Sequence, residues 1–308
     1  MILFASGRTD IPAYYSEWFF NRVKEKFVLV RNPYYSEQVT RYSIDPSVVD
    51  CIVFCTKNVR PMMSRLEEIA SFGKYFFVTI TPYGKDVEPN VPDKNTVMDD
   101  FIELSKIVGK DHICWRYDPV FVNADYPPSF HIREFRRMAE KLSGYTDRCI
   151  VSFVDLYEKT KKNFPGIKEV GKEDQTFLAR AFSFIAQGTK IQLSMCAEAT
   201  DFSAYGIERS GCVNGKIISA ASGYRILPQK PSPLRKNCSC LPMHDIGAYN
   251  TCPHLCKYCY ANYNADVVKK NFALHDPLSP FLIGGPKKGD VIKDAQQESW
   301  KDIQGVLF

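Results

Sequence analysis

The chain has 308 residues, of which 45% are hydrophobic and 24% are charged, and its formal net charge is +5. A chain of this length and apolar content buries a large core, which excludes an intrinsically disordered protein. Its basic residues form no continuous stripe, so the composition gives little support to a dedicated nucleic-acid-binding protein.

The first residues carry no basic leader and only a short apolar run, so we expect no signal peptide. The longest apolar runs, such as 51–55, are far shorter than the roughly 18 residues of a membrane span. We therefore expect a cytoplasmic protein without membrane association. In a reducing compartment, clustered cysteines among the eleven of this chain are better explained as metal ligands than as disulfides.

Short β-rich runs alternate with longer amphipathic segments over the first two thirds of the chain. The expected strands span residues 2–5, 27–30, 51–55, 75–80, 112–116, 149–154 and 191–195, with 212–219 as a candidate eighth. The expected helices span residues 14–26, 61–72, 95–108, 131–143 and 174–187. This alternation predicts an α/β fold, a (β/α) TIM-like barrel, with a doubly wound open sheet as the alternative.

Polar side chains follow most of the expected strands, and in a barrel these positions gather at one mouth, where active sites lie. We expect the cations there, together with Arg31, to bind anionic groups of a small-molecule substrate, and the carboxylates, together with Asp155, to orient its hydroxyl or amino groups. Singly, each such residue is more often a helix cap or part of a surface ion pair, and it is their recurrence at the ends of six or seven strands that favours a site. The predicted catalytic set is Arg8, Asp10, Lys57, Arg116, Asp118 and Glu198.

The character of the chain changes after about Leu227, where several prolines and then clustered cysteines follow. We predict a barrel domain over residues 1–227. Residues 228–308 are predicted to form a cysteine-rich, cluster-binding segment and a tail, with a short helix near 290–303.

Five cysteines of this segment lie close together as a C-x-C pair and a C-x3-C-x2-C loop. Thiolates at such spacing are typical ligands of iron–sulfur clusters, and we predict a [4Fe–4S] cluster. Structural zinc is the competitor, although zinc sites commonly use two C-x2-C pairs. The predicted metal ligands are Cys252, Cys256 and Cys259, with Cys238 and Cys240 nearby.

The remaining cysteines lie within or beside apolar runs, and we expect them to be small buried side chains. Cys196, which ends an expected strand, is the one expected to lie nearest the mouth. The six are Cys51, Cys55, Cys114, Cys149, Cys196 and Cys212.

The C-x3-C-x2-C loop, with Tyr258 before its last cysteine, resembles the cluster loop of radical S-adenosylmethionine enzymes. In that superfamily three cysteines hold three irons, and the open fourth iron binds S-adenosylmethionine, which the reduced cluster cleaves to a 5′-deoxyadenosyl radical. The resemblance implies S-adenosylmethionine as a cofactor, Tyr258 and Tyr260 as its neighbours, and an electron donor such as flavodoxin or ferredoxin. Segments 54–57, 79–82 and 115–119 are similar in style to the spore photoproduct lyase branch.

The whole chain resembles an uncharacterised family of bacterial proteins through segments 8–12, 115–119, 245–252 and 258–262. This resemblance covers about residues 1–285 and implies no assigned reaction. In radical enzymes the cysteine loop usually follows the first strand, whereas here it follows the last expected strand. A circular permutation places it at the same mouth. For the glycine-rich motif that binds the methionine amino group, only the displaced segment 284–286 is a candidate.

Three functions follow from these patterns. The first is a radical enzyme with its substrate in the barrel mouth. The second is a closed cluster, in which Cys238 or Cys240 supplies the fourth ligand and the cluster serves structure or electron transfer. The third is a nucleic-acid-binding or repair protein, which the lyase-like segments and the 13% aromatic content suggest.

Overall fold

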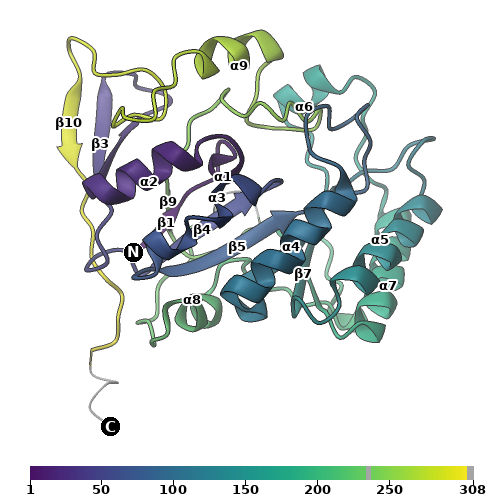
Figure 1. The fold of residues 1–308 in the computed structure, drawn as a ribbon. Coiled ribbons are helices and arrows are strands. Elements are labelled where there is room, and N and C mark those ends of the chain that lie inside the picture. Colours follow the sequence, from purple (N-terminus) through teal and green to yellow (C-terminus); the bar gives the residue numbers. More distant parts are fainter. Residues whose placement is uncertain (234–236, 304–308) are drawn as a thin grey trace.

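The computed structural model describes residues 1–233 and 237–303, and a parallel sheet of seven strands lies at its centre (Figure 1). The strand order is β8-β7-β6-β5-β4-β1-β9. Strands from β1 to β8 follow one another across the sheet in chain order, as expected when each crossover returns to a neighbouring position. The strands are β1 (Ile2–Phe4), β4 (Cys51–Thr56), β5 (Gly73–Thr79), β6 (Ile113–Val120), β7 (Arg148–Phe153), β8 (Gln192–Met195) and β9 (Met243–Asp245).

The strands at the centre of the sheet are buried on both faces, which is typical of parallel sheets. In β4 the run from Cys51 to Phe54 is fully buried. This run carries β-branched and aromatic side chains without polar alternation, so it specifies a buried strand rather than an edge. Leu3 of β1 pairs with Ile52 on one side, and Lys74 of β5 pairs with Ile52 on the other.

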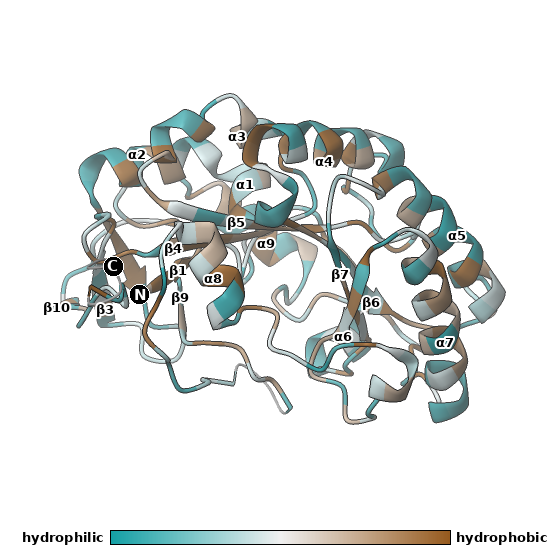
Figure 2. Cartoon of the chain, turned by 90° about the horizontal axis from the view of Figure 1, so that it is seen from below, coloured by the Kyte–Doolittle hydropathy of each residue, from teal (hydrophilic) through white to brown (hydrophobic). Residues whose placement is uncertain are grey.

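Long helices follow the outer side of the curved sheet (Figure 2). They are amphipathic, and α5 turns Phe135, Met138 and Leu142 inward at helical spacing. Phe135 stacks on Phe182 of the next long helix at 4.3 Å between ring centroids. The long helices are α2 (Ser16–Glu25), α4 (Lys94–Val108), α5 (Pro128–Leu142) and α7 (Lys172–Gly188); shorter ones are α1 (Ile11–Tyr14), α3 (Arg60–Met63), α6 (Glu158–Asn163), α8 (Gly215–Ser222), α9 (Ala265–Phe272) and the 3-10 turns η1 (Leu66–Ile69), η2 (Lys110–His112) and η3 (Ser203–Tyr205).

The expectation of a closed TIM-like barrel requires correction. Across the described residues the sheet ends at two edges, β8 and β9, and no ladder joins them. In a closed barrel the last strand stands between the first strand and the strand before it. Here β9 pairs with β1 but leaves the side toward β8 open, so the architecture is a curved open sheet with the strand order of a barrel.

A second, three-stranded sheet has the order β10-β3-β2. The strand expected at 27–30 forms, but it pairs with β3 in this sheet rather than in the main one. A local sequence pattern predicts a strand without identifying its partner. Arg31 lies there as well and donates to Asp290 at 2.8 Å, so the expectation that it lines the mouth is wrong. The strands are β2 (Phe27–Arg31), β3 (Gln38–Ser43) and β10 (Val291–Asp294).

Two further expectations about elements were wrong. Residues 212–219 do not form an eighth strand: the Asn214 side chain accepts from the backbone N–H of Ile217 and thereby starts helix α8. The helix expected near 290–303 is replaced by β10, because Val291 donates to the backbone oxygen of Glu37 and continues the ladder with β3.

The segment after residue 227 returns to the main sheet as β9, so the predicted boundary at 227 does not separate two sheets; the division into two domains stays a prediction. Helix α8 packs at the N-terminal end of the strands, where a Cβ atom on Gly73 would lie 2.8 Å from the Cα of Ser222. In Figure 1, α9 and α6 lie at the opposite end of the molecule from α8. Within the described ranges, no helix is long and apolar enough to cross a bilayer.

Candidate functional site

The cysteine loop, residues 246–264, leaves the sheet beside the first strand. β9 runs parallel to β1 with Asp245 opposite Phe4, so the loop after β9 begins next to the loop after β1. The hydroxyl of Tyr15, just after α1, donates to the backbone oxygen of Thr251 at 2.5 Å. The loop therefore lies where a loop after the first strand lies, as a permuted arrangement predicts.

Segments that follow other strands contact the same loop. After β5, the backbone oxygen of Val87 accepts from the N–H of Lys257 at 3.0 Å. After β7, the Thr160 hydroxyl donates to the backbone oxygen of Tyr258 at 3.1 Å. Because parallel strands end at the same edge of a sheet, the cysteine loop covers the C-terminal mouth, which is the usual place of active sites in this architecture.

Asp10 connects the loop to two strands. Its carboxylate accepts from the Thr56 hydroxyl at 2.6 Å, from the backbone N–H of Lys57 at 2.8 Å and from that of Ala13 at 3.1 Å. His254 Nε2 lies 2.9 Å from the same carboxylate. The side chain is buried and surrounded by donors, so its geometry supports positioning of the cysteine loop more directly than proton transfer.

The three thiols of the C-x3-C-x2-C loop share one electrostatic neighbourhood. Burial raises the pKa of Cys252, Cys256 and Cys259, and the charges of neighbouring cysteines raise the pKa of Cys252 and Cys256 further. Lys57 acts in the opposite direction on Cys256 and Cys259. With raised pKa values the thiols stay protonated at neutral pH, so binding of a metal must release protons.

A buried ion-pair network lies beside the loop, around Glu88. Its carboxylate accepts from the Lys57 ammonium at 2.8 Å and from the Thr81 hydroxyl at 2.6 Å, and it also binds Lys94 and the Tyr258 hydroxyl. Burial alone raises the pKa of Glu88, but the charges of Lys57 and Lys94 outweigh it and lower the pKa to about 2. Glu88 is not among the residues predicted from the sequence, although it follows β5 as the predicted residues follow other strands.

Arg116 and Asp118 form an ion pair at the end of β6. The Arg116 guanidinium also donates to the Cys55 sulfur at 3.1 Å, while its buried Nε has no hydrogen-bond partner. Arg116 also lies close enough to Cys196 and Cys212 to interact with a thiolate at either position. Arg116 therefore lies between Cys55 of β4 and the cysteines at the end of β8.

Arg8 pairs with Asp245 across the β1–β9 edge, with 2.8 Å between Nε and Oδ2. The Tyr260 hydroxyl donates to the backbone oxygen of Gly7 at 2.5 Å. The Arg8–Asp245, Lys57–Glu88 and Arg116–Asp118 pairs together mean that each predicted cation of the mouth is balanced by a carboxylate. The predicted roles of Arg8, Tyr258 and Tyr260 toward substrate and cofactor stay predictions.

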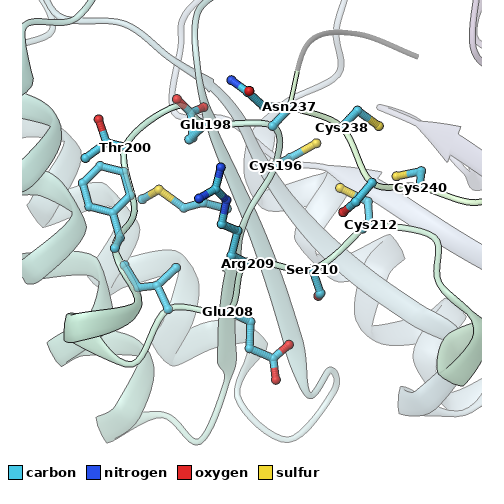
Figure 3. A pocket seen from close by; sticks show the side chains of 16 residues that line it. Cys196, Glu198, Thr200, Glu208, Arg209, Ser210, Cys212, Asn237, Cys238 and Cys240 are labelled. Carbon is cyan, nitrogen blue, oxygen red and sulfur yellow. The ribbon is translucent and has the colours of Figure 1, made fainter. Parts of the chain in front are cut away.

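A pocket of about 300 Å³ lies at the end of β8 (Figure 3). Glu198 lines it and accepts from the backbone N–H of Phe153 at 2.9 Å. The Cys212 thiol is hydrogen-bonded with Cys196 and Cys240, and Cys240 is also hydrogen-bonded with Cys238. The hydrogen bond with Cys212 is the main cause that lowers the pKa of Cys240.

The five predicted metal ligands are thus divided between two places. Cys238 and Cys240 line the pocket with Cys196 and Cys212, and the pocket lining includes none of the three cysteines of the loop. The expectation of a simple buried side chain is wrong for Cys212, which lies half-buried at this pocket, and it is confirmed for Cys51, Cys114 and Cys149. Residues 241–251, which include β9, lie between Cys240 and Cys252, so the pair and the three loop cysteines can occupy different places.

Across residues 1–233 and 237–303, no group of three or more histidine, cysteine or carboxylate side chains is arranged to hold a metal ion. Four thiolates around one zinc ion lie about 2.3 Å from the metal, and therefore roughly 4 Å from one another. A four-iron cluster instead carries its cysteines on separate iron atoms, so its ligands lie farther apart than those of a single ion. The absence of a single-ion arrangement among the described residues therefore does not decide whether the loop holds a cluster.

Comparison with known proteins identifies one family. A family model described as a domain of unknown function (DUF1848) matches residues 2–261, which include the main sheet and most of the cysteine loop. No curated protein and no solved structure matches the chain.

Proposed function

The chain belongs to the DUF1848 family, and we propose that it is an iron–sulfur enzyme of the radical S-adenosylmethionine type. In this proposal Cys252, Cys256 and Cys259 hold a [4Fe–4S] cluster. The observation that supports it best is the position of the cysteine loop, which comes late in the chain and yet covers the C-terminal mouth of the sheet. When bound, such a cluster in its reduced form would supply the one electron that cleaves S-adenosylmethionine to methionine and a 5′-deoxyadenosyl radical.

The residues around the loop fit a cluster. Cys259 accepts a hydrogen bond from the backbone N–H of Ala261 at 3.3 Å. Lys57 and Lys159 lower the pKa of Cys259 by their positive charge, against the effect of burial. Donors to sulfur and nearby cations stabilise the negative charge of thiolate-bound iron and tune its potential.

The chain's own residues hold the loop rigidly over the mouth. Asp10 and Tyr14 both bind the His254 ring, at 2.9 Å and 3.0 Å, while Glu88 binds the Tyr258 hydroxyl. These contacts fix the loop on two sides of its cysteines. We infer that they keep the open side of a cluster directed into the mouth, because a site needs its supporting residues locked in place.

The mouth suits a small polar substrate. Since its cations are already paired with carboxylates, we expect recognition through hydrogen bonds to these pairs rather than through one uncompensated charge. The electron donor is expected to be an acidic protein such as flavodoxin or ferredoxin. Exposed Lys257 in the loop and Lys162 next to it suit such a partner.

The closed-cluster function depends on Cys238 or Cys240 as a fourth ligand. Their hydrogen bonds with each other and with Cys212 favour the open, three-cysteine loop instead. The double substitution Cys238→Ser/Cys240→Ser distinguishes the two. It leaves the loop cluster intact under the open proposal, and it removes the cluster or converts it to a three-iron form under the closed one.

The proposal is tested by adding S-adenosylmethionine to anaerobically reconstituted, dithionite-reduced protein and quantifying 5′-deoxyadenosine by chromatography. We expect 5′-deoxyadenosine from the wild type and from Cys149→Ala, a control that removes a core cysteine far from the loop. We expect none from Cys256→Ser. If the wild type forms none, and S-adenosylmethionine leaves its electron paramagnetic resonance signal unchanged, the radical function is refuted.

A further inference from the structure

Four cysteines outside the cysteine loop come together from three separate segments of the chain. Cys196 follows β8, Cys212 lies after a short bridge to that strand, and Cys238 and Cys240 precede β9. Hydrogen bonds link Cys196 to Cys212, Cys212 to Cys240 and Cys240 to Cys238. Figure 3 shows the four sulfur atoms on the same side of the pocket.

The backbone is built to bring two of these segments into contact. A Cβ atom on Gly211 would lie 2.5 Å from the backbone oxygen of Ser239, so only glycine permits this approach. The backbone N–H of Leu241 donates to the oxygen of Val213 at 3.0 Å. Cys212 and Cys240 therefore face each other between a close backbone contact and a backbone hydrogen bond.

These segments lie between the two edges of the main sheet. Glu208 forms a parallel bridge with Ser194 on the outer side of β8, and Leu241 leads into β9 at the other edge. Across the described residues, no hydrogen-bonded strand pairing joins these two edges, β8 and β9. A link among the four cysteines would therefore connect the two edges.

Positive charge from the sheet faces the same cysteines. Arg116 and Arg148 lie close enough to these cysteines for their positive charge to interact with a thiolate of Cys212, and in the case of Arg116 also with a thiolate of Cys196. The Nε atom of Arg116 is buried without a hydrogen-bond partner. A donor of this kind, next to thiols, suits a centre that carries net negative charge, such as a metal ion with four thiolates.

We propose that Cys196, Cys212, Cys238 and Cys240 form a second metal site with four thiolate ligands, which joins the two edges of the sheet. The four thiols are not yet arranged around one point in the structure, so their side chains must rotate to reach the roughly 4 Å spacing that thiolates adopt around one zinc ion. Binding releases the thiol protons to solvent and changes no oxidation state. Rotation of the side chains then converts the hydrogen-bonded chain of thiols into a tetrahedron.

The site is independent of the cluster proposed for the cysteine loop. Four thiolates bind thiophilic metals, and the occupant can be a single ion such as zinc or a second iron–sulfur cluster. We propose the single ion, because it needs only four thiolates brought together by side-chain rotation and no inorganic sulfide. Its role is structural: it closes the side of the sheet that hydrogen bonds leave open, and it fixes the segment that leads through β9 into the cysteine loop.

The test measures zinc, iron and sulfide in the full chain purified without oxygen. We expect about one zinc per chain in the wild type and in Cys149→Ala, and loss of this zinc in Cys212→Ser/Cys240→Ser without loss of iron. If that substitution removes iron and sulfide while the triple variant Cys252→Ser/Cys256→Ser/Cys259→Ser retains them, the four-thiolate site is supported with a cluster as its occupant. If the metal content of the wild type equals that of Cys212→Ser/Cys240→Ser, the proposal is overturned.

A second measurement does not depend on the folding of the Cys212 variant. Co²⁺ is added to metal-free triple variant, in which the loop has no thiols, and absorbance reports tetrahedral thiolate coordination. We expect one cobalt site of this kind per chain, which zinc displaces. Absence of thiolate-to-cobalt absorption, or a disulfide between Cys212 and Cys240 in reduced preparations, overturns the proposal.

Discussion

Removal of the charge of Glu88 should destabilise the protein strongly. Glu88 is buried, and its carboxylate balances Lys57 and Lys94 while it also holds the Tyr258 hydroxyl of the cysteine loop. The substitution Glu88→Gln keeps the shape of the side chain but leaves two partly buried ammonium groups without their counter-charge. Breaking a buried ion pair on one side typically costs about 3–5 kcal/mol.

The pKa of Glu88 gives a second measure of the same effect. Its pKa is lowered from 4.5 to about 2, and each pKa unit corresponds to about 1.4 kcal/mol, so ionised Glu88 contributes on the order of 3 kcal/mol to the free energy of unfolding. For a lowered pKa this contribution is fully present above the unfolded pKa of about 4.5. It is lost as the pH falls from about 4.5 toward 2.

Urea unfolding of the wild type and of Glu88→Gln, followed by circular dichroism at a series of pH values, tests this reasoning. We expect a difference of about 3 kcal/mol at pH 7 that narrows below about pH 4.5. Glu158→Gln is the matched control, because Glu158 is an exposed partner of Lys161 and should leave stability unchanged. A difference below about 1 kcal/mol at pH 7, or one that does not depend on pH, would refute the proposed network.

Further predictions concern three other positions. Burial lowers the pKa of His131 to about 4. Between about pH 6.5 and 4 the wild type should therefore lose up to about 3 kcal/mol more unfolding free energy than His131→Gln. Urea unfolding of both proteins over this pH range tests this prediction, and equal losses would contradict it. Asp10→Asn should cost about 2–3 kcal/mol and speed amide hydrogen exchange in residues 250–262, whereas unchanged exchange there argues against its positioning role. Gly211→Ala should lower stability by about 1–3 kcal/mol in thermal unfolding because its Cβ meets the Ser239 backbone, and an unchanged melting temperature excludes the close approach.

The strands and long helices of the main sheet could be predicted from the sequence because their apolar runs and helical periodicity are local properties. The run from Cys51 to Phe54 is an example: it predicts a buried strand, and it forms β4. The sheet to which a strand belongs is not a local property. Residues 27–30 form a strand as predicted, but their partner β3 and the distant β10 place them in a separate sheet.

The candidate site shows the same division. The spacing of Cys252, Cys256 and Cys259 is local, and their shared neighbourhood follows from a single loop. The pairing of Cys240 with Cys212 depends on a contact between distant segments, which a C-x-C pattern does not reveal. The Glu88 network was missed for a related reason, because Lys57, Lys94 and Tyr258 meet this carboxylate from three different elements.

The position of the cysteine loop also has a physical explanation in the fold. Because β9 is added to the sheet next to β1, the last loop of the sheet and the first loop lie side by side. A chain can therefore carry cluster ligands at either of these two loops and direct them into the same mouth. The late position of the cysteines in the chain is therefore compatible with an active site at the C-terminal ends of the strands, where active sites of such sheets usually lie.

The central claim is that Cys252, Cys256 and Cys259 bind an iron–sulfur cluster, and the most direct test is the iron and acid-labile sulfide content of protein purified without oxygen. We expect about four iron and four sulfide per chain in the wild type from this loop, and loss of that amount in Cys256→Ser. Zinc without sulfide in the wild type, or full iron and sulfide content in Cys256→Ser, would contradict the claim.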